Sequence, residues 1–307
     1  MKLSFVIPCY RSENTISNVV DELEHKMSER PDFDYEIVAV NDQSPDSLWS
    51  VLKRLCEHHK RLKAVNLAKN GGKPIAQIAG FHYATGDIII CLDDDGQCPI
   101  DRLWDLIEPL NHGYDIAIAA YPIKKQSLIK NIGSNVNRKL SEILDGKKKE
   151  IVFSNFIARK RFVCDEIIKF HNPRTKLDSL TLRITNNIAM VEMEEREREV
   201  GKSGYTFRKS FKLLVDGCLA YSIVPMRLAY LLSGINGIVA CVMFVVLIVE
   251  AVLQKAVLPW FILLSIFVST MVVLFCVGLV GDYIARFYTS NNVPQYVVHD
   301  LINIEEE

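Results

Sequence analysis

The sequence predicts an α/β domain built on a mostly parallel, Rossmann-like sheet, followed by a pair of membrane-spanning helices. Two observations carry this prediction. Short apolar runs alternate with amphipathic stretches over residues 1–120, and residues 228–281 are almost wholly apolar. Regular β–α alternation indicates parallel strands joined by right-handed crossovers.

Each expected element of the first domain rests on its local pattern. Short apolar runs bounded by polar residues predict strands, and longer stretches with apolar residues at helical spacing predict helices. Asp46 or Ser44 is placed to cap the second helix. The expected strands are 3–7, 35–40, 62–67, 87–92, 115–120, 151–157 and 186–194, and the expected helices are 13–28, 47–59, 74–84, 102–111 and 160–169.

Charge and cysteine content exclude several classes of protein. The 307 residues include 36 Lys and Arg against 37 Asp and Glu, so the net charge of −1 argues against a general nucleic-acid binder. The eight cysteines form no C-x-x-C pair and stand mostly in apolar runs. They are typical of small hydrophobic residues in a reducing compartment, not of a zinc site or a disulfide framework.

Two apolar stretches, 228–253 and 256–280, each have the length of a membrane span. A helix of about 25 residues crosses a hydrocarbon core of about 30 Å with some tilt. A buried helical hairpin in a soluble protein is the alternative. Basic residues flank both ends, which by the positive-inside rule places both ends in the cytoplasm. These residues are Arg208, Lys209, Lys212, Arg227 and Arg286.

The full domain plan follows from these patterns. We expect an α/β domain at 1–204, an amphipathic juxtamembrane helix at 205–227, the two spans within 228–281, and a cytoplasmic tail at 282–307. A basic amphipathic stretch before a span is typical of a helix that lies along the headgroups, although a simple packing helix is the alternative. The N-terminal apolar run is too short for a signal peptide.

The stretch IIICLDDDGQCPI, residues 88–100, runs from a buried-type strand into three aspartates. Aspartate runs are usually solvated loops, but ligands of open α/β sheets bind just beyond the carboxyl ends of the strands. Alternation along the strand turns Asp93 and Asp95 to one side and Asp94 to the other. Two carboxylates, with Gln97 as a neutral oxygen donor, suit Mg²⁺ or Mn²⁺.

Six motifs in order resemble glycosyltransferase family 2, which has the GT-A fold. They are FVIPCYRSENTI, EIVAVNDQSPD, NLAKNGGKPIAQIAGFHYATGD, CLDDDGQCP, GYTFRKSFKLLVDG and GDYIARFYTSNNVPQYVV, with the apolar hairpin between the last two. The last two motifs, with the hairpin, narrow the resemblance to the polyprenyl-phosphate branch of that family, and the resemblance covers nearly the whole chain. This branch includes dolichol-phosphate mannose synthases and undecaprenyl-phosphate glucose and aminoarabinose transferases.

The resemblance assigns roles to residues of the first half. It implies that Pro8, Tyr10 and Glu13 contact the nucleoside, that Asp42 reads the base, and that Lys73 reaches the base or the diphosphate. Asn41 precedes Asp42 where many relatives have a second acidic residue.

The resemblance also assigns the metal and the leaving group. Asp93, Asp95 and Gln97 match the metal-binding D-x-D-x-Q motif of the family. Asp94, between them, is implied not to bind the metal directly and is assigned to the nucleotide-sugar site. Cys98 stands where many relatives have a further Asp.

Arg198 and Ser203 match a later R-x-x-G-x-S element that closes over the donor diphosphate. Relatives often have Lys where this chain has Gly204, and Lys202 is a candidate substitute. The implied catalytic residues are therefore Asp93, Asp95 and Arg198.

The implied reaction moves a sugar, with inversion, from a nucleotide-sugar to a polyprenyl phosphate at the inner (plasma) membrane. A UDP-sugar is favoured as donor, although GDP and dTDP donors also fit. Basic residues after the fifth strand are implied for the acceptor phosphate: Lys124, Lys125, Lys130 and Arg138. The sugar and the oligomeric state stay open, a homo-oligomer being one option.

Three alternatives remain at this point. A processive polysaccharide synthase would carry more spans and a Q-x-x-R-W element, which this sequence lacks. A family 2 transferase with a non-lipid acceptor would usually need a carboxylate base. A non-catalytic membrane scaffold that binds a nucleotide-sugar would not need the paired aspartates.

Overall fold

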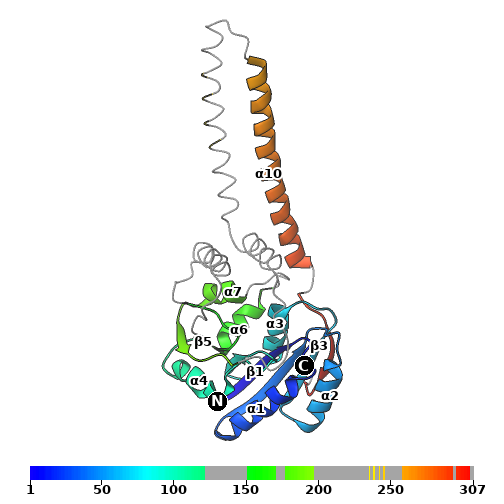
Figure 1. The fold of residues 1–307 in the computed structure, drawn as a ribbon, viewed down its shortest axis with the longest axis vertical. Helices are drawn as coiled ribbons and strands as arrows, with labels where there is room; N and C mark the ends of the chain where they lie inside the picture. The colour runs from blue at the N-terminus through cyan, green and yellow to red at the C-terminus, as the bar shows by residue number, and fades with distance from the viewer. Residues whose placement is uncertain are drawn as a thin grey trace. The chain divides into compact units, whose positions relative to one another are not determined.

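The computed structural model describes residues 1–121, 151–170, 177–196, 258–292 and 295–304, together with the single positions 235, 238, 242 and 245. Contacts within the chain divide it into two compact units. One unit is residues 1–206 with 290–307, and the other is residues 207–289. The first unit contains the sheet (Figure 1).

Strands and helices alternate along most of the described chain, as Figure 1 shows by colour, and α10 lies almost wholly in the second unit. In chain order the elements are β1 (Lys2–Cys9), α1 (Ile16–Ser28), β2 (Asp34–Asn41), α2 (Leu48–His58), β3 (Leu62–Leu67), α3 (Lys73–Tyr83), β4 (Ile88–Cys91), the 3₁₀ helix η1 (Ile100–Arg102), α4 (Leu103–Asn111), β5 (Ile116–Ala120), β6 (Ile157–Lys160), α6 (Arg161–Ile168), α7 (Leu177–Ile184), β7 (Ile188–Glu192), α10 (Leu258–Asn292) and β8 (Val298–Ile302).

The strands form one mixed sheet in the order β7-β5-β6-β4-β1-β2-β3-β8. The pairs β1–β2, β1–β4, β2–β3 and β5–β7 are parallel. β6 is antiparallel to β4 and β5, and β8 is antiparallel to β3. The predicted α/β fold with a mostly parallel sheet is therefore confirmed.

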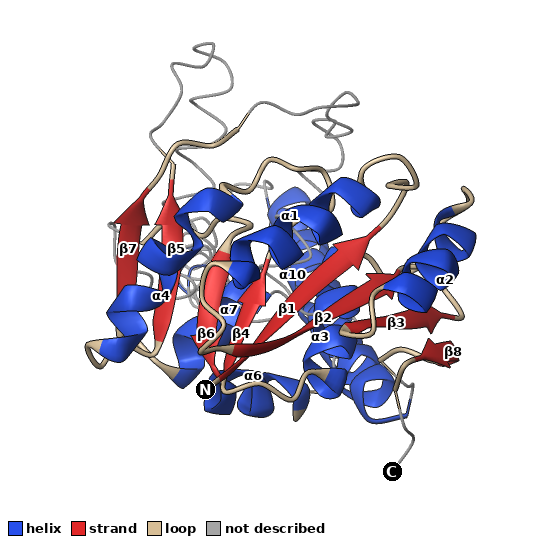
Figure 2. Cartoon of the chain, turned by 90° about the horizontal axis from the view of Figure 1, so that it is seen from below, coloured by secondary structure: helices blue, strands red, loops and turns tan. Residues whose placement is uncertain are grey.

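Helices cover both faces of the sheet. Figure 2 shows α1, α2 and α4 on the near face, with α3 and α6 beyond it. Because side chains alternate along β1, Phe5 and Ile7 join the core beneath α1, whereas Val6 faces α3. A Cβ on Gly80 of α3 would stand 2.3 Å from a Val6 methyl carbon, so only glycine allows this close approach of helix and sheet.

The strand expected at 151–157 is wrong for most of its length. β6 begins at Ile157, and Ile151 and Phe156 are buried outside any strand. Arg159, although charged, lies within β6. Its side chain is buried within the sheet domain, with Nη1 3.3 Å from Cys91 Sγ and the guanidinium 5.7 Å from the centre of the Phe81 ring.

Three features of the later chain were not predicted. They are α7, the strand β8, and the extension of the helix after the expected second span, since α10 continues to Asn292. Most of residues 205–257, including the amphipathic stretch and most of the first expected span, lie outside the described residues. Among the residues that the structure describes, no helix qualifies as a candidate membrane span.

Candidate active site

The site lies where the carboxyl ends of β1, β2 and β4 meet. Tyr10, Asp42 and Asp93 follow these three strands within two residues of their ends. The Asp42 amide donates to Cys9 O at 3.1 Å, and the Tyr10 amide donates to Asp94 Oδ2 at 3.0 Å. Neighbouring parallel strands thus deliver the predicted nucleotide and metal residues to one edge, as the topology requires.

Asp94 holds the aspartate turn against the first β–α loop. Besides accepting from Tyr10, its main-chain oxygen accepts from Thr15 Oγ1 at 2.6 Å. Burial raises the pKa of Asp94 to about 6, although the Tyr10 amide and other donors favour its charged form. Asp94 therefore has a structural position behind the turn, which agrees with its predicted separation from Asp93 and Asp95.

Asp95 and Gln97 form the outer part of the turn. Asp95 Oδ1 accepts from the main-chain N–H of Gln97 at 3.2 Å, and Gly96 between the two residues has φ +75°. That left-handed backbone favours glycine and brings the two flanking residues round the same bend. Gln97 Nε2 donates to Arg196 O at 3.4 Å.

Lys73 begins α3 and reaches the aspartate turn. Its ammonium group forms an ion pair with Asp93 Oδ1 and donates to Asn155 Oδ1 at 2.8 Å. The ammonium group of Lys73 therefore lies beside Asp93, the first aspartate of the turn. Asn155 was missed by the sequence reasoning, because it lies 82 residues from Lys73 within a stretch that was assigned to a strand.

Asp42 holds the glycine loop that precedes Lys73. Its two carboxylate oxygens accept from the amides of Gly71 and Gly72, at 2.7 and 2.8 Å. Burial raises the pKa of Asp42, and these two hydrogen bonds act in the opposite direction. Gly72 has φ +84° and caps the helix N-terminus. In this structure Asp42 therefore fixes the approach of α3 to the site.

The remaining predicted nucleoside residues lie around the first loop. Glu13 Oε2 accepts from the Ser47 amide at 2.8 Å, at the N-terminus of α2. The Tyr10 side chain is 45% exposed, with the Arg11 guanidinium 5.5 Å from its ring centre. Pro8 is buried in β1 opposite Val40 of β2. Tyr10 is therefore an exposed aromatic side chain at this end of the strands.

Cys98, the departure from the resembled pattern, is buried under the turn. Its sulfur accepts from the Asp93 amide at 3.5 Å, and Tyr121 hydrogen-bonds to it. Burial raises the pKa of the Cys98 thiol to about 12, so this position is neutral. A thiol therefore supports the turn at the position where the resembled pattern implies a carboxylate.

The chemistry of these donors fits a divalent cation that is shared with a substrate. Among the described residues no group of three or more His, Cys, Asp or Glu side chains is arranged to hold a metal. The turn instead offers two carboxylates and an amide. Mg²⁺ is commonly bound by one or two carboxylates while phosphate oxygens and water complete its shell.

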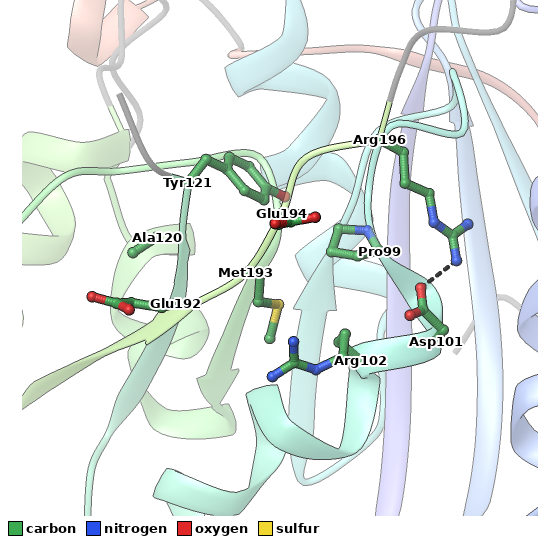
Figure 3. Close-up of a pocket in the computed structure, with 9 residues that line it drawn as sticks. All are labelled: Pro99, Asp101, Arg102, Ala120, Tyr121, Glu192, Met193, Glu194 and Arg196. Carbon is green, nitrogen blue, oxygen red and sulfur yellow. Dashed lines mark hydrogen bonds and ion pairs between the residues drawn. The ribbon is translucent and has the colours of Figure 1, made fainter. Parts of the chain in front are cut away.

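A cavity of about 680 Å³ opens beside the turn, at the ends of β5 and β7 (Figure 3). Figure 3 shows Arg196 reaching Asp101 across its rim. The cavity is lined by Pro99, Asp101, Arg102, Ala120, Tyr121, Glu192, Met193, Glu194 and Arg196.

Six predicted site residues lie outside the part of the chain that the structure describes. They are Arg198 and Ser203 of the diphosphate element and Lys124, Lys125, Lys130 and Arg138 of the acceptor group.

Comparisons with known proteins agree with this architecture. The chain is 28% identical to the uncharacterised glycosyltransferase YkcC of Bacillus subtilis (strain 168), over 100% of this chain and 96% of the relative. It is 27% identical to the undecaprenyl-phosphate 4-deoxy-4-formamido-L-arabinose transferase of Enterobacter sp. (strain 638), over 98% and 94%. The resemblance to the polyprenyl-phosphate branch is thereby confirmed.

A solved structure shares the fold. Mannosyl-3-phosphoglycerate synthase from Rubrobacter xylanophilus superposes with a TM-score of 0.51 over 71% of each chain, at 17% identity. Residues 4–168 match the family model described as glycosyl transferase family 2. This match covers more than half of the chain and includes the whole aspartate turn, so the chain belongs to glycosyltransferase family 2.

Proposed function

We propose that this enzyme moves a sugar, with inversion, from a nucleotide-sugar to a polyprenyl phosphate at a membrane. One observation carries the proposal. The turn from Asp93 to Gln97 presents two carboxylates and an amide at the end of β4, with Lys73 paired to the first carboxylate. The near full-length similarity to a transferase named for undecaprenyl phosphate supports a lipid acceptor.

The donor nucleotide lies across the ends of β1, β2 and β4 in this proposal. Tyr10 offers its exposed ring to the base, and Asp42 lies at the end of the adjacent strand. We favour a UDP-sugar. The diphosphate then extends toward Lys73 and the aspartate turn, where positive charge is required to hold it.

Asp93, Asp95 and Gln97 would hold Mg²⁺ or Mn²⁺. A bound cation supplies positive charge to the leaving diphosphate. Lys73, from the N-terminus of α3, adds a second positive charge at the same point. Arg198 and Ser203 are proposed to contact the diphosphate from the other side.

The bond changes need no strong base. An oxygen of the acceptor phosphate forms a bond to the anomeric carbon while the bond from that carbon to the diphosphate breaks. The bonding electron pair leaves with the nucleoside diphosphate. A phosphate monoester is largely ionised at pH 7, so the residues act by positioning and by charge. Lys124, Lys125, Lys130 and Arg138 are proposed to hold the acceptor phosphate.

Membrane attachment belongs to the same proposal. The apolar stretches 228–253 and 256–280 have the length of two spans. Described side chains of α10 expose large apolar groups, including Ile262, Met271 and Phe275. We propose a plasma-membrane enzyme with its catalytic unit and both termini in the cytoplasm.

The test uses the full chain purified in detergent, undecaprenyl phosphate, and a panel of labelled nucleotide-sugars with Mg²⁺, Mn²⁺ or EDTA. We expect label in the lipid phase from one donor, no label with EDTA, and an inverted anomeric configuration in the product. Label transferred only to an added water-soluble acceptor would instead favour a non-lipid transferase. Nucleotide binding without any transfer would favour a scaffold.

A further inference from the structure

Two hydrogen bonds join the aspartate turn to the chain that follows β7. The Arg196 amide donates to Gln97 O at 3.1 Å, and Gln97 Nε2 donates to Arg196 O at 3.4 Å. These two residues are 99 positions apart in the chain. Because Nε2 is directed at Arg196 O, Oε1 is the amide atom that faces away from it. The contact therefore fixes the orientation of the Gln97 side-chain amide, with Oε1 on the side away from Arg196 O.

The Arg196 side chain is held from two further elements. Nη1 donates to Glu22 Oε1 of α1 at 2.7 Å, and Nη2 forms an ion pair with Asp101 of η1. Burial lowers the pKa of Arg196, but the two carboxylates outweigh burial and raise it. A planar guanidinium can satisfy two carboxylates at fixed angles, which a lysine ammonium does not reproduce.

The three attachments join Arg196 to α1, to η1 and to Gln97 of the turn. α1 follows the loop that contains Tyr10, η1 follows the turn directly, and the Arg196 main chain contacts Gln97 itself. A rotation of the Gln97 side-chain amide therefore breaks its hydrogen bond to the Arg196 main chain. That main chain is itself held in place, because the Arg196 guanidinium is paired with both Glu22 and Asp101. Isolated surface ion pairs contribute little, but a guanidinium shared by two carboxylates restricts the backbone that carries it.

We propose that Arg196 is a positioning residue for metal binding by the Asp93–Gln97 turn. It contacts neither substrate nor metal, and it acts through Gln97, whose amide oxygen it orients. This inference depends on the proposed function only in that the turn binds a divalent cation. Residues that orient metal ligands typically change metal affinity by 10–100-fold when they are removed.

The experiment measures Mn²⁺ binding to the full chain in detergent by electron paramagnetic resonance, with and without UDP. We expect R196Q to weaken Mn²⁺ binding about tenfold, while its unfolding temperature stays close to that of the wild type. R196K should recover only part of the affinity. R102Q is the matched control, because it removes the same charge from a side chain that forms an ion pair with exposed Asp105 of α4.

Two further variants make the test independent of the folding of R196Q. E22Q and D101N each remove one of the two carboxylates that hold Arg196. Each should weaken Mn²⁺ binding by roughly two- to threefold, which is part of the tenfold effect expected for R196Q. Combining either with R196Q should add little, because the partners act as one unit. Equal Mn²⁺ affinity in R196Q and the wild type would overturn the inference.

Failure of the inference is distinct from failure of the proposed function. Wild-type protein that binds Mn²⁺ but transfers no sugar to lipid would contradict the function and leave the role of Arg196 intact. Lipid transfer with unaltered Mn²⁺ binding in R196Q would do the reverse. Wild-type protein that binds no Mn²⁺ even with UDP would contradict both.

Discussion

Asp94 and its two neighbours show how one turn gives three adjacent carboxylates different positions. Asp93 pairs with Lys73, Asp95 accepts from the Gln97 amide, and Asp94 is bound to the first β–α loop. Like charges so close together would repel in an apolar setting, and each is given a separate partner. Asp94 is held to the first β–α loop by Tyr10 and Thr15, whereas Asp93 and Asp95 have their partners elsewhere.

At this scale we predict that D95N abolishes most of the sugar transfer. Amide replacement keeps the size of the side chain but removes a charge that holds the cation. Loss of one such electrostatic contact commonly costs about 10²–10³-fold in turnover. The measurement is turnover with saturating donor, alongside the Mn²⁺ affinity. D105N, which changes an exposed carboxylate on α4, is the control, and full activity in D95N would exclude Asp95 as a metal ligand.

The sequence predicted the site residues that stand in recognisable motifs, including Asp42 and Lys73 far from the turn in the chain, and it missed those that no motif marks. Asp93, Asp95 and Gln97 share one bend and were found by alternation and spacing. Asn155 and Arg196 reach the turn from distant positions. Arg196 stands in the charged run EREREV, which in isolation has the pattern of a solvated loop. No local signal distinguishes its role from that of its neighbours.

At the scale of elements, Glu36 joins four segments near the amino ends of the strands, at the other end of the strands from the site. Its buried carboxylate on β2 accepts from Ser4 on β1 at 2.6 Å, from Lys63 on β3 at 2.8 Å, and from Thr85 before β4; it also pairs with Lys2 at 3.0 Å. Burial raises the pKa of Glu36. The hydrogen bonds from Lys63, Ser4, Thr85 and Lys2 outweigh burial and lower that pKa to about 2.

We predict a pH-dependent loss of stability on E36Q. Because the folded pKa lies below the unfolded value, the carboxylate stabilises the fold above about pH 4.5, and this contribution disappears as the pH falls toward about 2. The shift corresponds to about 3 kcal/mol at neutral pH. Urea unfolding followed by tryptophan fluorescence would measure it. The difference from the wild type should shrink on acidification, whereas E57Q, an exposed change on α2, should have little effect at any pH.

The strand β8 protects the edge of the sheet. It pairs with β3 through Ala64–Ile302 and Val65–Leu301, and Asn303 Nδ2 donates to Leu62 O at 2.8 Å. Sequence reasoning missed it because VHDLI is short and carries a charge and a histidine, as edge strands often do. The antiparallel β6 was also misplaced, since it has only four residues and two of them, Arg159 and Lys160, are charged.

Removal of residues 296–307 should therefore expose a mostly buried, apolar β3 edge. We expect a lower unfolding temperature, by several degrees, and a larger aggregated fraction on size-exclusion chromatography. Removal of residues 305–307 alone is the matched control. An unchanged, monodisperse protein after the longer deletion would show that β8 adds nothing to the edge.

At the scale of the whole molecule, the apolar stretches predict that the full chain partitions into membranes. We expect it in the membrane fraction after an alkaline carbonate wash, and in solution only after detergent is added. Replacing Ile262, Ile266 and Val273 of α10 with lysine should reduce that fraction strongly, since charges within a span are costly. Complete release of the wild type by carbonate would contradict the proposed spans.

The position of β8 constrains the topology of the chain in a way that is independent of any hydropathy pattern. The polypeptide leaves the sheet unit at residue 206 and re-enters it at residue 290, because β8 is hydrogen-bonded to β3. A folded sheet unit occupies one side of a bilayer. The intervening segment must therefore cross an even number of times or not at all. A single crossing, or three, is possible only if β8 is unpaired from β3, so the parity of the membrane topology is set by one short edge strand.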